Sequence, residues 1–300
     1  MKKKTYLFAL MAMALTLGSC SDNENGIGGE TSKYITVSTS IGNMTRVATD
    51  ANGGQTFEEG DEISVYAWTG DATIAPDASE RVVNNAINKL TSSSWVSTPQ
   101  MLWKNNRDKH YFIGVYPTAA ISNLSAGEYT FDVNKQTESD LLVAVNKDGL
   151  SYNVDEQQPV PLTFTHVMAK LVVNLTYKNQ WGGIPTVEKV VVGNAAKEAT
   201  INYLTKVVTP STTAKEDFSL PEITENTKYV SVIIPQEEVT QLTIVIGGKN
   251  FVYDNGTPFK LESGKITTVN LEVGRDEIKL GDVKITNWED GSTFKGEALN

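Results

Sequence analysis

Cysteine and histidine, the side chains that most often carry nucleophilic or metal chemistry, are scarce in this chain. Cys20 is the single cysteine among 300 residues, and the two histidines, His110 and His166, are far apart in the sequence. One cysteine cannot form a disulfide within its own chain, and no second cysteine is left to share a zinc ion with the histidines. We therefore expect no bound metal and no cofactor.

Motifs typical of enzymes are missing as well. The sequence holds no G-x-S-x-G, no phosphate-binding loop, no dinucleotide fingerprint and no EF-hand loop. A carboxylate pair for glycoside hydrolysis stays open as an alternative among the 36 acidic residues, but their spacing singles out no pair. We expect no catalytic residue and no enzymatic activity.

Cys20 stands where lipid attachment would place it. Lysines 2–4 precede an apolar stretch, Tyr6–Gly18, which ends on Leu17-Gly18-Ser19 directly before the cysteine. The stretch is too short for the ~20 residues of a membrane span, and its order predicts a signal peptide over residues 1–19. The four residues Leu17-Gly18-Ser19-Cys20 resemble the lipobox of bacterial lipoproteins, in which the cysteine becomes the acylated N-terminus. The alternative is an ordinary signal peptide with an incidental cysteine.

Residues 20–33 form the expected tether behind this lipid. They are polar, acidic and rich in glycine, as flexible linkers are. An acidic stretch after the lipidated cysteine also resembles the surface-export signal of Bacteroidota lipoproteins, with a plain linker as the alternative. Removal of residues 1–19 takes away three lysines and no acids, which moves the net charge from −10 to −13. This charge argues against nucleic-acid partners, and we expect a lipid-anchored outer-membrane protein at the cell surface.

The rest of the chain alternates with period two. Apolar residues recur at every second position in separated runs, and the runs are rich in β-branched and aromatic residues: Ile35/Val37/Ile41, Ile63/Val65/Ala67, Leu171/Val173/Leu175, Leu242/Ile244/Ile246 and Val269/Leu271/Val273. Such alternation predicts strands with one face on a core. Turn dipeptides separate the runs, and the clearest hairpin joins Gln241–Ile246 to Phe251–Tyr253 through Gly247-Gly248. Residues 81–90 fit either a short helix or a strand.

Two domains are expected. A proline-bearing segment, Gln157–Pro161, marks the boundary, because proline cannot donate to a central β-ladder. The predicted division is 34–160 for the N-terminal domain, 161–290 for the C-terminal domain and 291–300 for a polar tail.

The two histidines are expected in different surroundings. We expect His166 to be packed and hydrogen-bonded within a strand, and His110 to lie on an exposed loop.

Several short blocks follow one another in a specific order along nearly all of the chain after the tether. They are Thr45–Ala48, Phe57–Ala67, Trp95 and Trp103 with Tyr111–Pro117, Asp140–Ala144, Leu162–Leu171 and Ile285–Trp288. Together they resemble the fimbrillins, the pilin-like lipoproteins of Bacteroidales type V pili, with Val115 departing from a family tyrosine. The resemblance implies an all-β chain of two tandem transthyretin-like β-sandwich domains.

The resemblance also gives Arg46 a role. In the family, an Arg-specific protease cuts the precursor after an arginine that follows the first strand, which here implies cleavage between Arg46 and Val47. The cut would remove residues 34–45 with Ile35, Val37 and Ile41, and leave unpaired backbone groups beside an apolar groove. A strand donated by another subunit could fill that groove. The alternative is that Thr45-Arg46 is a polar turn after a strand that is never lost.

The donor strand is expected near the C-terminus. Ile278, Leu280, Val283 and Ile285 alternate well enough to serve, whereas the segment after Trp288 is polar and breaks the alternation. We therefore expect a structural or adhesive subunit of a surface pilus, at the tip or in an accessory or anchor position rather than in the stalk. Its partners would be other pilus subunits, the membrane lipid, and a host or glycan ligand. A surface glycan-binding lipoprotein is the alternative, and it would need exposed aromatic side chains.

Overall fold

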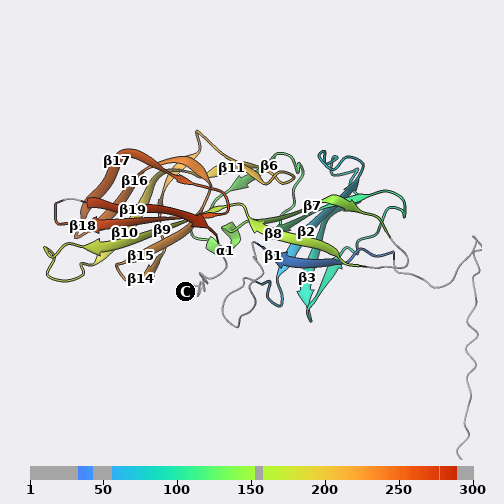
Figure 1. The fold of residues 1–300 in the computed structure, drawn as a ribbon, viewed down its shortest axis with the longest axis horizontal. Helices are drawn as coiled ribbons and strands as arrows, with labels where there is room; N and C mark the ends of the chain where they lie inside the picture. Colours follow the sequence, from blue (N-terminus) through green and yellow to red (C-terminus); the bar gives the residue numbers. More distant parts are fainter. Residues whose placement is uncertain (1–32, 43–55, 153–157, 277, 289–300) are drawn as a thin grey trace, which may run out of the picture. The chain divides into compact units, whose positions relative to one another are not determined.

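The computed structural model describes residues 33–42, 56–152, 158–276 and 278–288. Strands make up nearly all of the regular structure, and one short helix, α1 (Gln136–Ser139), interrupts them (Figure 1). The strands form four sheets of seven, five, four and three strands. The all-β fold expected from the alternation is confirmed.

A seven-stranded sheet contains most strands of the N-terminal half. Its spatial order is β1-β8-β7-β5-β2-β3-β4. The strands are β1 (Val37–Ile41), β2 (Glu62–Thr69), β3 (Val83–Thr91), β4 (Ser94–Thr98), β5 (His110–Tyr116), β7 (Leu142–Leu150) and β8 (Val160–His166). Within the sheet, β1 and β8 run parallel, and the other neighbours are antiparallel.

Two further sheets face each other in the C-terminal half. One has the order β14-β15-β9-β18-β19 and the other the order β13-β10-β16-β17. Side chains from both sheets, such as Val173, Val269, Val192 and Leu242, belong to one buried cluster. The strands are β9 (Ala169–Tyr177), β10 (Val187–Ala196), β13 (Lys215–Ser219), β14 (Glu222–Thr224), β15 (Lys228–Ile233), β16 (Gln236–Ile246), β17 (Lys249–Leu261), β18 (Lys265–Val273) and β19 (Ile278–Asn287).

A small third sheet links the two halves of the chain. It has the order β12-β11-β6 and consists of β6 (Gly127–Thr130), β11 (Glu198–Asn202) and β12 (Val207–Pro210). The N-terminal segment thus contributes β6 to a sheet whose other strands come from the C-terminal half. In the opposite direction, β8 pairs with β1 and β7 in the seven-stranded sheet although it lies after residue 160. The division into domains at residue 160 stays a prediction.

Strand β2 shows how the seven-stranded sheet is buried. Ile63, Val65 and Ala67 point into one apolar cluster, and Tyr66 and Trp68 point into another. Both sets are buried, so neither face of β2 lies in water. An apolar run that is buried on both faces is typical of a central strand.

Two local predictions can be compared with the strands directly. The hairpin at Gly247-Gly248 is confirmed, because Ile246 pairs with Lys249 and both glycines have positive φ angles, 59° and 72°. Two positive φ angles in succession are what a two-residue hairpin turn of type I′ requires. Of the two interpretations of residues 81–90, the strand is correct, since β3 covers Val83–Thr91.

Candidate strand-exchange site

The first strand occupies an edge of the seven-stranded sheet. Its register with β8 runs from Val37 opposite Val160 to Ile41 opposite Phe164. The ladder extends at each end, where Val160 N–H donates to Thr36 O at 2.8 Å and Gly42 N–H donates to Phe164 O at 3.0 Å. Figure 1 shows β1 beside β8. The backbone of β1 is therefore held on one side by β8 alone.

The side chains of this strand complete an apolar core. Ile35 and Val37 are 2% and 6% exposed and belong to a cluster with Phe112, Leu162 and Phe164, against which Ile41 packs at the margin. Burial of one such aliphatic side chain stabilises a fold by about 1.5–3 kcal/mol. All three residues that we predicted to leave with the first strand thus face the core rather than solvent.

A second set of contacts holds the segment from the opposite side. Ile35 N–H donates to Met101 O at 2.9 Å, and Trp103 N–H donates to Lys33 O at 3.1 Å. The indole Nε1–H of Trp95 on β4 donates to Thr39 Oγ1 at 3.0 Å. The two edge strands of the seven-stranded sheet, β1 and β4, thus approach each other across the core. These cross-connections join residues more than 50 positions apart, and periodicity gives no signal for them.

The tryptophans around this core do not form an exposed aromatic platform. Trp68 is fully buried. Trp95 meets the ring of Phe57 edge-on at 5.3 Å, and Trp103 meets His110 and Phe112 edge-on at 4.9 and 5.8 Å. Both half-buried indoles use their rings for packing within the protein, and this does not favour the alternative of stacking on a sugar.

The candidate donor residues lie in β19, the edge strand of the five-stranded sheet. This strand pairs antiparallel with β18 from Ile278 opposite Val273 to Asn287 opposite Lys265. The register shifts near Gly281, so that Leu280 lies opposite Leu271 while Val283 lies opposite Val269. A bulge of this kind adds one residue to one strand and restores the alternation beyond it. Ile278, Leu280, Val283 and Ile285 consequently share one face.

That shared face is only partly buried. Ile278, Leu280 and Val283 pack against the margin of the core, and Ile285 is 39% exposed. Their partners on β18, among them Val269 and Leu271, are fully buried. A strand with four apolar side chains on one face has the pattern needed to fill an apolar groove.

The end of β19 is anchored by a mixed cluster of rings and charges. Trp288 stacks on His166, and His166 Nδ1–H donates to Asp140 Oδ1 at 2.7 Å. The ammonium of Lys170, which is buried, lies 5.3 Å from the centre of the indole ring. Burial lowers the pKa of Lys170, while Asp140 acts in the opposite direction. The expectation that His166 is packed and hydrogen-bonded is confirmed.

The prediction for His110 is wrong. This residue begins β5, is completely buried, and accepts a hydrogen bond from Lys104 N–H on Nε2 at 3.1 Å. Its Nδ1–H donates to Asp108 O at 3.0 Å, so both ring nitrogens are satisfied by a neutral imidazole. Burial lowers the pKa of His110. The polar neighbours Asp108 and Lys109 suggested a loop, but the loop ends one residue earlier than we expected.

Three predicted site residues lie outside the described part of the chain. They are Cys20, Arg46 and Val47. Over the described ranges, no group of three or more acidic, histidine or cysteine side chains is arranged to hold a metal ion. In the same ranges, no helix has the length and apolar character needed to cross a membrane.

The chain is similar to known proteins in sequence and in fold. A model of the fimbrillin-like family matches residues 45–288. A candidate fimbrium subunit of Bacteroides uniformis, Fim1C, is 25% identical over 97% of this chain and 97% of its own length.

Solved structures show the same fold. A candidate cell adhesion protein from Bacteroides uniformis is similar with a TM-score of 0.64 and 19% identity, over 86% of this chain and 100% of its own. The tip fimbrial protein Mfa3 from Porphyromonas gingivalis is similar with a TM-score of 0.50 and 12% identity, over 77% of this chain and 95% of its own. The family match spans most of the chain, and such proteins are structural rather than enzymatic. This chain belongs to the fimbrillin-like family.

Proposed function

We propose that this fimbrial protein assembles by exchange of its first strand. The observation that carries the proposal is the position of β1, an edge strand: its Val37, together with Ile35 just before the strand, completes a core shared with β8. Loss of this strand would uncover Leu162 and Phe164 and free the outer edge of β8. An apolar groove beside an unpaired strand edge binds another strand.

In this proposal, strand β1 is lost when a protease cleaves the chain after Arg46. The segment that would leave, residues 34–45, contains all of β1 and its buried side chains. It would carry away the acylated Cys20 and the tether in the same step. Until then, the lipid holds the precursor to the outer membrane, and export depends on the signal peptide of residues 1–19.

We place the cleaved protein at the tip of a pilus or in an accessory position, and we assign the anchor position only to a chain that keeps Arg46 uncut and its lipid in place. The support is that β19, the candidate donor, is already paired with β18 over its whole length. A chain that keeps this strand in its own sheet accepts a partner strand more readily than it donates one. The partners in this proposal are other pilus subunits.

The decisive experiment follows the N-terminus of the protein in fimbriae sheared from the native bacterium. Mass spectrometry should find Val47 as the first residue. Arg46→Ala should leave acylated Cys20 in place and keep the protein out of the fimbriae, whereas Arg107→Ala, a change of an exposed arginine in a loop, should alter neither. Full-length chains starting at Cys20 within sheared fimbriae would contradict the proposal.

A test in solution isolates the groove from the protease. A chain that begins at Val47 should bind a synthetic peptide of residues 34–45 and regain the thermal stability of the intact protein. The same peptide with aspartate in place of Ile35 and Val37 should not bind, because a charge cannot enter the apolar cluster without a large desolvation cost. Equal binding of both peptides would show that the groove does not recognise the strand by these side chains.

A further inference from the structure

Strand β6 has an edge that no other described strand covers. It pairs with β11 on one side, with Tyr129 opposite Ala199 and Thr130 opposite Glu198. Phe131 N–H donates to Lys197 O at 2.8 Å, which continues the same register. Because antiparallel pairs alternate in the direction of their backbone groups, residues 127, 129 and 131 face β11. Glu128 and Thr130 therefore direct their N–H and C=O groups away from β11.

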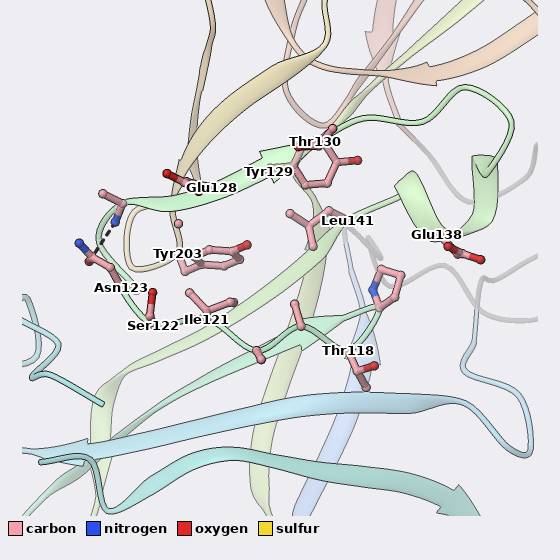
Figure 2. A pocket seen from close by; sticks show the side chains of 15 residues that line it. Thr118, Ile121, Ser122, Asn123, Glu128, Tyr129, Thr130, Glu138, Leu141 and Tyr203 are labelled. Atoms are coloured by element: carbon pink, nitrogen blue, oxygen red, sulfur yellow. Dashed lines mark hydrogen bonds between the residues drawn. The ribbon is translucent and has the colours of Figure 1, made fainter. Parts of the chain in front are cut away.

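This free edge borders a hollow of about 640 Å³. The opposite wall is the segment Pro117–Asn123, and Leu141 and Tyr203 lie between the two walls (Figure 2). The volume falls within the range of about 300–1,000 Å³ in which proteins bind small ligands or a few residues of a peptide. The hollow is therefore large enough for a short extended segment alongside β6.

Tyr203 presents an unused hydrogen-bonding group to this space. The residue is only 3% exposed, yet its hydroxyl makes no hydrogen bond to any described residue. No fully buried polar side-chain atom of the described chain lacks a partner, so this hydroxyl oxygen must open onto the hollow that Tyr203 lines. Figure 2 shows it directed toward Leu141. Burial raises the pKa of Tyr203, so the hydroxyl keeps its proton and can donate.

The wall opposite β6 is fixed from behind. The Tyr66 hydroxyl donates to Ala119 O and accepts from Ile121 N–H. The buried guanidinium of Arg81 donates to Ile121 O at 2.8 Å and to Ser122 O at 2.6 Å. A wall held by hydrogen bonds in this way loses little conformational freedom when a ligand binds, which favours affinity.

Charge at the two ends of the hollow selects the kind of ligand. Glu128 and Glu138 stand at opposite ends of it (Figure 2), and none of the described residues that line it is a lysine, arginine or histidine. Glu138 forms an exposed ion pair with Lys135 at 3.2 Å, whereas no ion pair to a described residue is found for Glu128. An exposed pair such as that of Glu138 contributes little energy. The carboxylate of Glu128 thus remains open to a cation of the ligand.

We propose that this hollow binds an extended peptide segment of a partner protein that carries a lysine or arginine. The segment adds to the free edge of β6 through the backbone of Glu128 and Thr130, its basic side chain pairs with Glu128, and a carbonyl of its backbone accepts from the Tyr203 hydroxyl. This docking site is separate from the groove of β1 and does not depend on the loss of that strand.

The test uses the full mature chain with β1 in place and a defined probe, the blocked pentapeptide Ac-TVKVT-NH2, measured by NMR titration. Binding should shift the amide signals of residues 128–130. Glu128→Gln and Tyr203→Phe should each weaken binding by about 3- to 10-fold, the effect of one lost hydrogen bond or charge contact. Glu225→Gln, at an exposed acid in a distant turn, should leave binding unchanged.

Two further probes separate edge pairing from simple charge attraction. The peptide with glutamate in place of lysine should bind at least 10-fold more weakly. The lysine peptide with methylated backbone nitrogens cannot donate to β6 and should also lose binding. If the methylated peptide binds as well as the parent, or if Tyr203→Phe and Glu128→Gln have no effect, the proposal is wrong. Because the intact chain is used, failure here leaves the exchange of β1 untouched.

Discussion

The imidazole of His166 lies flat on the indole of Trp288, with ring centroids 4.0 Å apart and planes inclined by 6°. His166 ends β8 in the seven-stranded sheet, and Trp288 follows β19 in the five-stranded sheet. One stacked pair thus joins the sheet of the first strand to the sheet of the candidate donor strand. The contact makes Trp288 the residue that holds the end of β19.

Trp288→Ala should therefore destabilise the protein. Truncation of a buried tryptophan costs about 3–5 kcal/mol in the free energy of unfolding, because packing is lost and a cavity remains. Urea unfolding followed by fluorescence measures the change. Hydrogen exchange should at the same time rise selectively in residues 283–287. A matched control is Trp181→Ala, a half-buried tryptophan whose Nε1–H donates to Val273 O, opposite Ile278 at the start of β19.

The stack itself can be isolated by a double-mutant cycle with His166→Ala. The double variant should lose about 0.5–1.5 kcal/mol less unfolding free energy than the sum of the losses in the two single variants. This difference is the energy of an aromatic pair beyond its buried area. Strictly additive losses would mean that the two rings are neighbours without an energetic link.

Trp95→Phe should loosen β1 without removing any of its core side chains. The phenyl ring keeps most of the packing but cannot donate to Thr39 Oγ1. Loss of one hydrogen bond costs about 0.5–1.5 kcal/mol, so local opening of β1 should become about 2- to 10-fold more frequent. Hydrogen exchange at Val37–Ile41 measures this opening. Thr39→Val should have a similar effect, and adding it to Trp95→Phe should have little more.

The buried imidazole of His110 predicts a loss of stability in acid. Its pKa is lowered in the folded state, so below about pH 6.5, the ordinary value of histidine, the unfolded chain binds more protons than the folded one. The free energy of unfolding must then fall as the pH falls through this range, until the folded form is protonated too. Urea unfolding at pH 7.5 and 5.5 should show a larger decrease for the native chain than for His110→Gln. Equal decreases would assign the acid sensitivity to other groups.

Gly114→Ala tests the packing beneath β8. A Cβ atom at this position would lie 2.6 Å from the ring of Phe164, which is fully buried and cannot move aside. Overpacking of this kind costs about 1–3 kcal/mol. Gly193→Ala is the matched control, because its nearest atom, at 2.7 Å, is the amide oxygen of the flexible Gln241 side chain. Thermal unfolding should separate the two variants clearly.

Strand content was predictable because it depends on local alternation. Val173, Leu175, Val269 and Leu271 are buried as their spacing indicates, and the turn at Gly247-Gly248 forms as its residue types require. The spacing between Leu280 and Val283 departs from strict alternation. The bulge near Gly281 explains it, because one additional residue brings both side chains to the same face.

Contacts between distant segments could not be predicted in the same way. The sequence around Thr39 does not predict that Trp95 will donate a hydrogen bond to it. The sequence around Val160 does not predict that Val37 will be its partner in a parallel pair of strands. The hollow beside β6 is also assembled from segments far apart in sequence, with Tyr203 brought against Pro117–Asn123. His110 was misjudged although its contacts are local: its ring packs on Trp103, and its two ring nitrogens pair with the backbone of Lys104 and Asp108.

The separation of β1 and β19 has a geometric consequence for assembly. The two strands belong to different sheets and differ in sequence, so a contact in which one replaces the other joins unlike surfaces of two subunits. Contacts between unlike surfaces repeat without closing unless a rotation forms a ring. A fibre built on them has direction. One end of such a fibre has a groove that no strand fills, and the other end has a donor strand that no groove receives. A subunit that can only accept a strand, or only donate one, therefore lies where the fibre starts or stops.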